Sequence, residues 1–184
     1  LLILYSVFMM GIMIVSHRFL QPYLVDLGLD LSYIGIVYFV WLIIGALSAI
    51  ITHKIENSIG EFYSLLIVPI FLGIQLIFIS QFVIYFSIIV IFLGEFTWGF
   101  TKPLIKDYIN KHVASSHRAT ILSLDGFIKS LLLVIIAPFF GYIADMYSIT
   151  ATLLIQGVFA LVIGIPLVFL IKHGGKGNGS RQKV

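Results

Sequence analysis

The chain has 184 residues, of which 60% are hydrophobic and 10% are charged, and it contains no cysteine. A soluble domain has roughly 45–50% apolar and about 25% charged residues, so this chain has too little polar surface to face water on all sides. The lack of cysteine excludes disulfides, thiolate metal sites and cysteine nucleophiles. The net charge of +3 does not predict a nucleic-acid partner, because the basic residues lie at the ends of apolar runs. The composition therefore predicts an all-α membrane protein whose main partner is the lipid bilayer.

Six membrane-spanning helices are predicted, since one pass needs about 20 apolar residues, or about 30 with its turn. An acidic turn over residues 26–30 ends the first apolar run, and Ser32 is the expected cap of the second helix. The stretch 53–61 is too charged for hydrocarbon and is predicted to be a loop. Residues 80–81 break the next apolar stretch, and Pro103 is expected to end the fourth helix. The predicted helices cover residues 1–24, 32–52, 62–79, 82–101, 119–143 and 149–171.

These helices make one domain, residues 1–173, followed by a glycine-rich tail, residues 174–184. The tail has no means of burying apolar area and is expected to be disordered. The chain starts at Leu1 directly on an apolar run with no basic leader, so we expect it to be a piece of a larger protein.

The basic residues predict the orientation in the membrane, because lysine and arginine stay on the cytoplasmic side. One set of helix ends has Asp26, Asp30 and Asp145 with only Arg18 nearby. We therefore expect a multi-pass protein of the plasma (inner) membrane with a cytoplasmic C-terminus. The other, cytoplasmic, ends carry eight basic residues: Lys54, Lys106, Lys111, Arg118, Lys172, Lys176, Arg181 and Lys183.

Two segments carry a resemblance to a known family: GEFTWGFTKPLIKDYINKHVASSHRATILSLDGFIKS, which starts at Gly94, and APFFGYIADMYS, which ends at Ser148. They resemble the tenth and eleventh helices of a major facilitator superfamily transporter. The rest of the chain resembles this family more weakly. The glycine-rich loop motif of the family is reduced here to Lys54, Asn57 and Gly60, with Glu61 where a basic residue is usual.

The resemblance implies that the chain is the C-terminal six-helix half of a twelve-helix permease. Such a protein is a secondary active transporter, a symporter or antiporter, that moves a small-molecule solute by alternating access. The cavity would lie at the junction with a missing N-terminal half or with a homodimer partner. The first, second, fourth and fifth helices predicted here would line it.

Glu95 is the strongest candidate for proton coupling. It lies among apolar and aromatic residues about two helical turns before Pro103, where an ionised carboxylate without a partner is expensive. A carboxyl held near neutral in a cavity can take up and release a proton as access alternates. The competing interpretation is a salt bridge that holds two helices together.

His17, Arg18 and Gln21 form a polar group in the first helix, with His17 and Gln21 on one face. His17 can carry a coupling proton, because imidazole titrates near neutral pH, or it can be a packed, hydrogen-bonded residue. Arg18 either lines the cavity or extends to the lipid headgroups of the nearer surface.

Asp125 and Lys129 are four residues apart in the fifth helix, the spacing of a helical ion pair. The estimated depths also allow two pairs between helices, Lys102 with Asp125 and Lys129 with Glu95. Lys129 is expected to face the cavity, whereas Lys102 and Asp125 are expected to neutralise each other near the cytoplasmic surface.

Trp98, one turn from Glu95, is a candidate for stacking on a substrate, and Trp41 is a weaker one. Tryptophan is also common at membrane interfaces.

The sequence contains no metal, phosphate-loop or nucleophile motif, so we expect no enzyme activity, no cofactor and no metal site. An intramembrane enzyme that uses His17 with a carboxylate is a weaker possibility. The main alternative to transport is a half-bundle that does not transport but binds or regulates a membrane partner.

Overall fold

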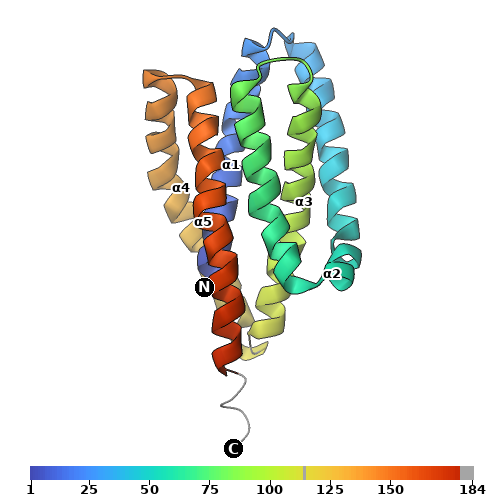
Figure 1. Cartoon of the computed structure of the whole chain (residues 1–184), viewed down its shortest axis with the longest axis vertical. Coiled ribbons are helices and arrows are strands. Elements are labelled where there is room, and N and C mark those ends of the chain that lie inside the picture. Colours follow the sequence, from blue (N-terminus) through green and yellow to red (C-terminus); the bar gives the residue numbers. More distant parts are fainter. Residues whose placement is uncertain (114, 179–184) are drawn as a thin grey trace, which may run out of the picture.

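The computed structural model describes residues 1–113 and 115–178, with side chains as far as residue 173. The regular secondary structure of this part of the chain is all helical, with no strand (Figure 1). Each of its five long helices has the length and hydropathy of a membrane-spanning helix. The chain thus has the architecture of an all-α, multi-pass membrane protein. The elements are α1 (Leu2–Asp26), α2 (Leu31–Gln81), α3 (Ser87–His112), the short 3₁₀ turn η1 (Ser115–His117), α4 (Arg118–Met146) and α5 (Ile149–Asn178).

Gly60 divides α2 into two helices. Its backbone angles, φ 80° and ψ 169°, are non-helical and lie in a region that glycine adopts without the steric strain other residues would meet. The first limb (31–59) and the second limb (61–81) run in opposite directions on either side of it (Figure 1). The predicted loop over residues 53–61 is therefore wrong in extent: these residues are helical except at Gly60. Asp30, rather than Ser32, occupies the cap position of α2.

Besides the first limb of α2, two other helices extend further than the sequence predicts. α3 continues through Pro103 to His112, so the predicted end at residue 101 is wrong. A proline removes only one backbone hydrogen bond, and packed neighbours allow a membrane helix to tolerate that loss. α5 runs to Asn178, past the predicted end at residue 171, and the rest of the predicted tail, residues 179–184, lies outside the described residues. The predicted break at residues 80–81 is confirmed, because α2 ends at Gln81.

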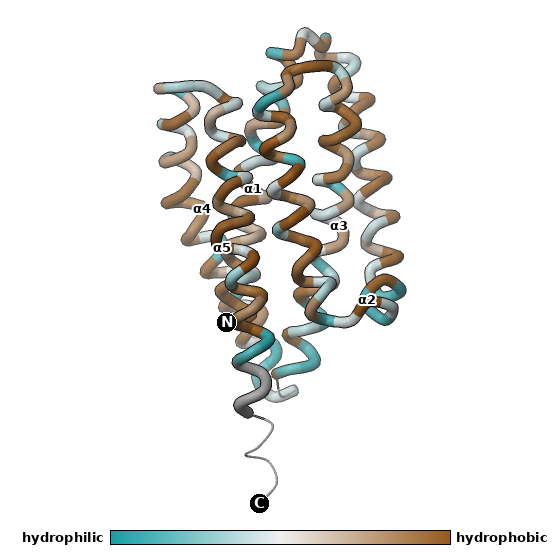
Figure 2. The backbone as a smooth tube through the Cα atoms, in the orientation of Figure 1, coloured by the Kyte–Doolittle hydropathy of each residue, from teal (hydrophilic) through white to brown (hydrophobic). Residues whose placement is uncertain are grey.

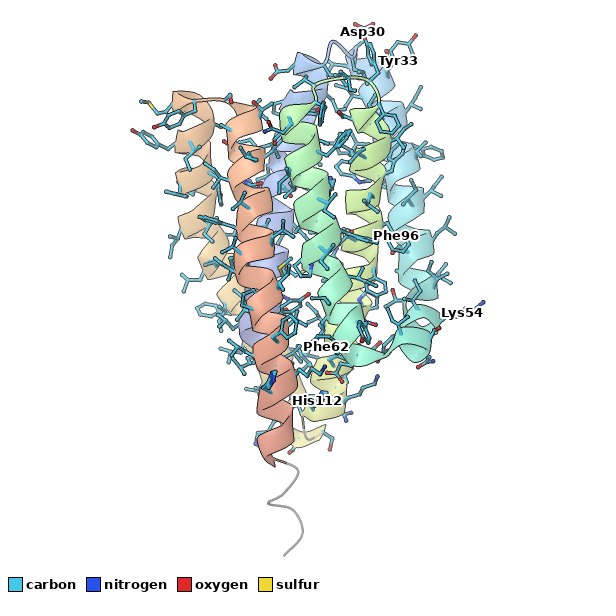
Figure 3. The ribbon with its side chains drawn as sticks, in the orientation of Figure 1. Asp30, Tyr33, Lys54, Phe62, Phe96 and His112 are labelled. Atoms are coloured by element: carbon cyan, nitrogen blue, oxygen red, sulfur yellow. The ribbon has the colours of Figure 1, made fainter. Side chains whose placement is uncertain are left out.

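The two ends of the bundle differ in charge. We call the end with Asp30 and the turns α1–α2, α2–α3 and α4–α5 the acidic end, and the opposite end, with Lys54 and His112, the basic end (Figure 3). The helices between the two ends are mostly apolar, and hydrophilic residues gather at the basic end (Figure 2). This matches the arrangement of helix ends that the basic residues predict.

Small residues hold α2 close to α3. The backbone of α2 at Gly45 packs so tightly against Gly99 that a Cβ on Gly99 would collide with the Gly45 carbonyl. Just beyond this crossing, Ser48 Oγ donates a hydrogen bond to the Phe96 carbonyl at 2.5 Å. Small residues and hydroxyl groups are the usual means by which membrane helices approach each other closely. The first limb of α2 is thereby fixed against the middle of α3.

α4 lies at the edge of the bundle, where it contacts mainly α1 and α5. Only three of its residues are buried: Asp125, Phe140 and Ile143. Many of its other large apolar side chains, such as Phe127 and Val134, are exposed, and the rest are half-buried. This face of α4 therefore requires lipid or another protein surface to cover it.

The close approach at Gly99 makes a prediction for stability. Gly99→Ala should lower the free energy of unfolding by about 1–3 kcal/mol, because the added methyl group overpacks the α2–α3 crossing. Gly126→Ala is the matched control: a Cβ there meets nothing within 4 Å. It should leave the stability unchanged or raise it, since alanine favours helix by about 1 kcal/mol. Thermal unfolding in detergent measures both variants, and equal effects would contradict the packing described here.

Candidate functional site

His17 lies between two tryptophan rings. Its ring centroid is 4.7 Å from that of Trp41 and 4.6 Å from that of Trp98, and both pairs are stacked. The three side chains come from α1, the first limb of α2 and α3. The indole nitrogen of Trp41 is buried and has no hydrogen-bond partner in the described part of the chain. Two aromatic faces therefore hold the imidazole in place, and no hydrogen bond joins it to the backbone of the described residues.

Glu95 extends the same cluster. Its Oε2 lies 3.5 Å from His17 Nε2, and the residue is only 5% exposed. Gly45 of α2 makes room for it, because a Cβ at that position would lie 2.5 Å from Glu95 Oε1. The α2–α3 crossing thus both brings the tryptophans to His17 and leaves space for a carboxyl group. We call His17, Trp41, Glu95 and Trp98 the His–Glu site.

Lys102 places a positive charge beside this site. Its ammonium group lies 4.3 Å from the centroid of the Trp98 ring, one helical turn from that residue. A cation over an indole face is an attractive arrangement. Glu95, Trp98 and Lys102 follow one another along α3 at intervals of three and four residues, so they lie on one face of the helix. An anion formed at Glu95 therefore has a cation close by.

The His–Glu site lies deep within the bundle. His17 and Glu95 are each about eight or nine residues from the acidic end of their helices, which is about 12–14 Å at the helical rise. Phe96, next to Glu95, lies between Asp30 at one end and Lys54 and His112 at the other (Figure 3). This depth is near the middle of a hydrocarbon layer about 30 Å thick.

Asp125 and Lys129 form a second charged group, on α4. Their side chains make the predicted ion pair between residues four apart. Of the pairs predicted between helices, Lys129 with Glu95 is wrong, since Lys129 pairs with Asp125 and Glu95 faces His17. Lys102 and Asp125 line the same cavity of about 140 Å³, but they form no ion pair in the described residues. A depth estimated by counting residues does not fix which way a side chain faces around its helix, so it could not identify the partner of Lys129.

Arg18 and Gln21 are both exposed and lie outside the His–Glu site. His17 and Gln21 lie four residues apart in α1, so they share one face of this helix as predicted, but Gln21 takes no part in the His–Glu site. His17 itself keeps 29% of its side chain exposed, whereas the Glu95 side chain keeps 7%. The surface of the bundle is therefore reached through His17, whereas Glu95 is enclosed by its neighbours.

A third polar group, at the basic end, is one that sequence reasoning missed. Glu56 is buried and accepts a hydrogen bond from Lys111 at 2.5 Å. His53 Nδ1 lies 3.2 Å from Asp107 and 4.0 Å from Glu56. These residues appear scattered in the sequence because α2 was predicted to end before them and α3 before Asp107. Reading both helices through to the basic end would have shown that they meet.

The His–Glu site can hold and exchange a proton. Imidazole and carboxyl groups are the side chains that most readily transfer protons near neutral pH, and here they face each other in a mostly apolar setting. Comparison with known proteins adds no further assignment: neither a family model, nor a curated protein, nor a solved structure matches the chain.

The stacking of His17 makes the fluorescence of the protein a reporter of this site. The chain has two tryptophans, and both stack on His17. Imidazole protonation changes the quenching of a stacked indole, so the emission should change as the pH falls from about 8 to about 4. His17→Gln should remove most of that change, while His112→Gln, whose imidazole stacks on no tryptophan, should retain it. An unaltered response in His17→Gln would show that the rings do not stack in solution.

Proposed function

We propose that the chain is one six-helix half of a secondary active transporter of the major facilitator type, which couples the movement of a small solute to protons. The observation that carries this proposal is the pairing of buried Glu95 with His17 between two tryptophans, deep in a bundle of apolar helices. An ionisable residue inside a membrane is by default a candidate for function. The resemblance of residues 94–148 to the tenth and eleventh helices of that family supports the same conclusion.

The charge balance of the site supports proton exchange at Glu95. With one proton present, His17 and Glu95 together are neutral, whether the proton is on the imidazole or on the carboxyl group. Loss of this proton leaves one negative charge, which Lys102 offsets from its position over Trp98. Counted together with Lys102, the site therefore carries one positive charge with the proton and is neutral without it, so the net charge never exceeds one as the proton is bound and released.

The difference in exposure suggests the route of the proton. His17 is the open side of the site and Glu95 the closed side. In the proposed mechanism a proton arrives at His17 and passes to Glu95, and it leaves by the same side when access has changed to the other face of the membrane. The two tryptophans hold the imidazole in line for this transfer and offer flat surfaces for an apolar part of the solute.

The exposed faces of the bundle fit a half-transporter. The first limb of α2 and most of α4 present large apolar side chains outward, among them Phe39, Leu42 and Val134. A second six-helix bundle, either a separate half or another copy of this chain, would cover part of these faces and enclose the His–Glu site. In the proposed orientation the basic end is cytoplasmic, because it carries most of the lysine and arginine.

Glu95→Gln tests the proposal. In liposomes containing the purified full-length protein, screened against a panel of small solutes, the wild type should accumulate a solute in response to a pH gradient. Glu95→Gln should reduce this accumulation to background while still exchanging labelled for unlabelled solute, since only the proton step is removed. Glu61→Gln, a half-buried carboxylate at the basic end, is the matched control and should retain gradient-driven uptake.

Two outcomes would contradict the proposal. Gradient-driven uptake that persists in Glu95→Gln would exclude Glu95 from coupling. A protein that transports no solute of the panel, with or without a gradient, would favour a membrane interaction or regulatory role.

A further inference from the structure

Three side chains at the basic end have the chemistry of a metal site. His53 and Glu56 lie three residues apart on the first limb of α2, so they share one face of that helix. Asp107 comes from α3. One nitrogen or oxygen atom of each residue lies within 4.8 Å of the corresponding atoms of the other two. The cluster therefore offers one imidazole and two carboxylates from two helices.

The spacing of these atoms suits a small metal ion. His53 Nδ1 is 3.2 Å from Asp107 Oδ2 and 4.0 Å from Glu56 Oε2. In a tetrahedral site with bonds of about 2.0–2.2 Å, neighbouring ligand atoms are about 3.3–3.6 Å apart. The Glu56 and Asp107 oxygens lie within 4.8 Å of each other, so the side chains must rotate to bring all three atoms into coordination distance.

The ligand atoms are also free to bind. Lys111 occupies Oε1 of Glu56, which leaves Oε2 directed toward His53. Asp107 Oδ2 is shielded from solvent, and although His53 Nδ1 lies 3.2 Å away, no contact in the described part of the chain has hydrogen-bond geometry at this oxygen. A buried carboxylate oxygen without a well-aligned donor is costly, and a cation would satisfy it. His53, by contrast, has a side chain that is 63% exposed, so an ion can enter from the water at the basic end.

We propose that His53, Glu56 and Asp107 bind a divalent transition metal of the zinc class, with water completing the coordination. An imidazole ligand favours such a metal over magnesium or calcium, which prefer oxygen alone. The bound ion fastens the first limb of α2 to α3 just before the reversal at Gly60. Lys111 places a positive charge beside the site and lowers its affinity, so the site binds metal reversibly. This inference does not depend on the transport function.

Cobalt binding tests the proposal, because four-coordinate Co²⁺ with a histidine ligand gives a visible absorption band. The full-length protein, purified without a polyhistidine tag, should give this band on titration with Co²⁺ and lose it on addition of Zn²⁺. His53→Ala and Asp107→Asn should each weaken Co²⁺ binding about 10–100-fold or more. Lys111→Gln, which keeps all three ligands and removes the competing charge, should tighten it several-fold.

His112→Ala is the matched control. His112 faces Glu61 at 3.8 Å at the same end of the bundle, but with no third ligand beside it in the described residues. This variant should bind Co²⁺ as the wild type does. The proposal is overturned if the wild type gives no band, if His53→Ala binds as tightly as the wild type, or if His112→Ala loses binding equally. If His53→Ala fails to fold, an unchanged affinity of Lys111→Gln for Co²⁺ overturns the proposal instead.

Discussion

The burial of the Glu95 carboxyl group is the constraint on which the arrangement of the bundle depends. A carboxylate in a membrane interior is costly unless it is neutralised or paired. Here the imidazole of His17 faces it, and Gly45 leaves space for its oxygen atoms. This arrangement requires α1, the first limb of α2 and α3 to meet at one depth. Each helix must also be rotated about its axis so that these side chains face one another. The stacked rings of Trp41 and Trp98 maintain that orientation, because they hold the imidazole from both sides.

The packing that creates this site also explains the shape of the molecule. Close contact at Gly45 and Gly99 binds the first limb of α2 to α3, and the non-helical backbone at Gly60 turns the chain back to form the second limb. The second limb packs against α5, so α2 contributes to both sides of the bundle. α4 is left at the edge with few buried residues. The polar contacts at the basic end, between Glu56 and Lys111 and between His53 and Asp107, then connect the same two elements a second time.

The sequence predicted the helical class and most helix boundaries, because lipid demands long apolar runs and polar turns between them. It also singled out Glu95, His17 and Trp98, since polar and aromatic residues inside such runs are conspicuous. It assigned the wrong partner to Glu95, Lys129 instead of His17, because counting residues gives depth but not the direction in which a side chain points. The group around His53 and Asp107 was missed for a different reason. Charged residues near the ends of α2 and α3 predict loops, but both helices continue past their apolar segments and there bring distant residues together.

Infrared difference spectroscopy of the full-length protein in lipid, comparing high with low pH, tests most directly whether Glu95 is the group that exchanges a proton. The carbonyl stretch of a protonated carboxyl group absorbs at a frequency separate from the bands of carboxylates and of the backbone. If Glu95 exchanges the proton, such a band should appear on acidification and be absent in Glu95→Gln. Its frequency should change in His17→Gln, because the imidazole faces the carboxyl group. A band that remains unchanged in Glu95→Gln, or the absence of any titrating carboxyl band in the wild type, would contradict proton exchange at Glu95.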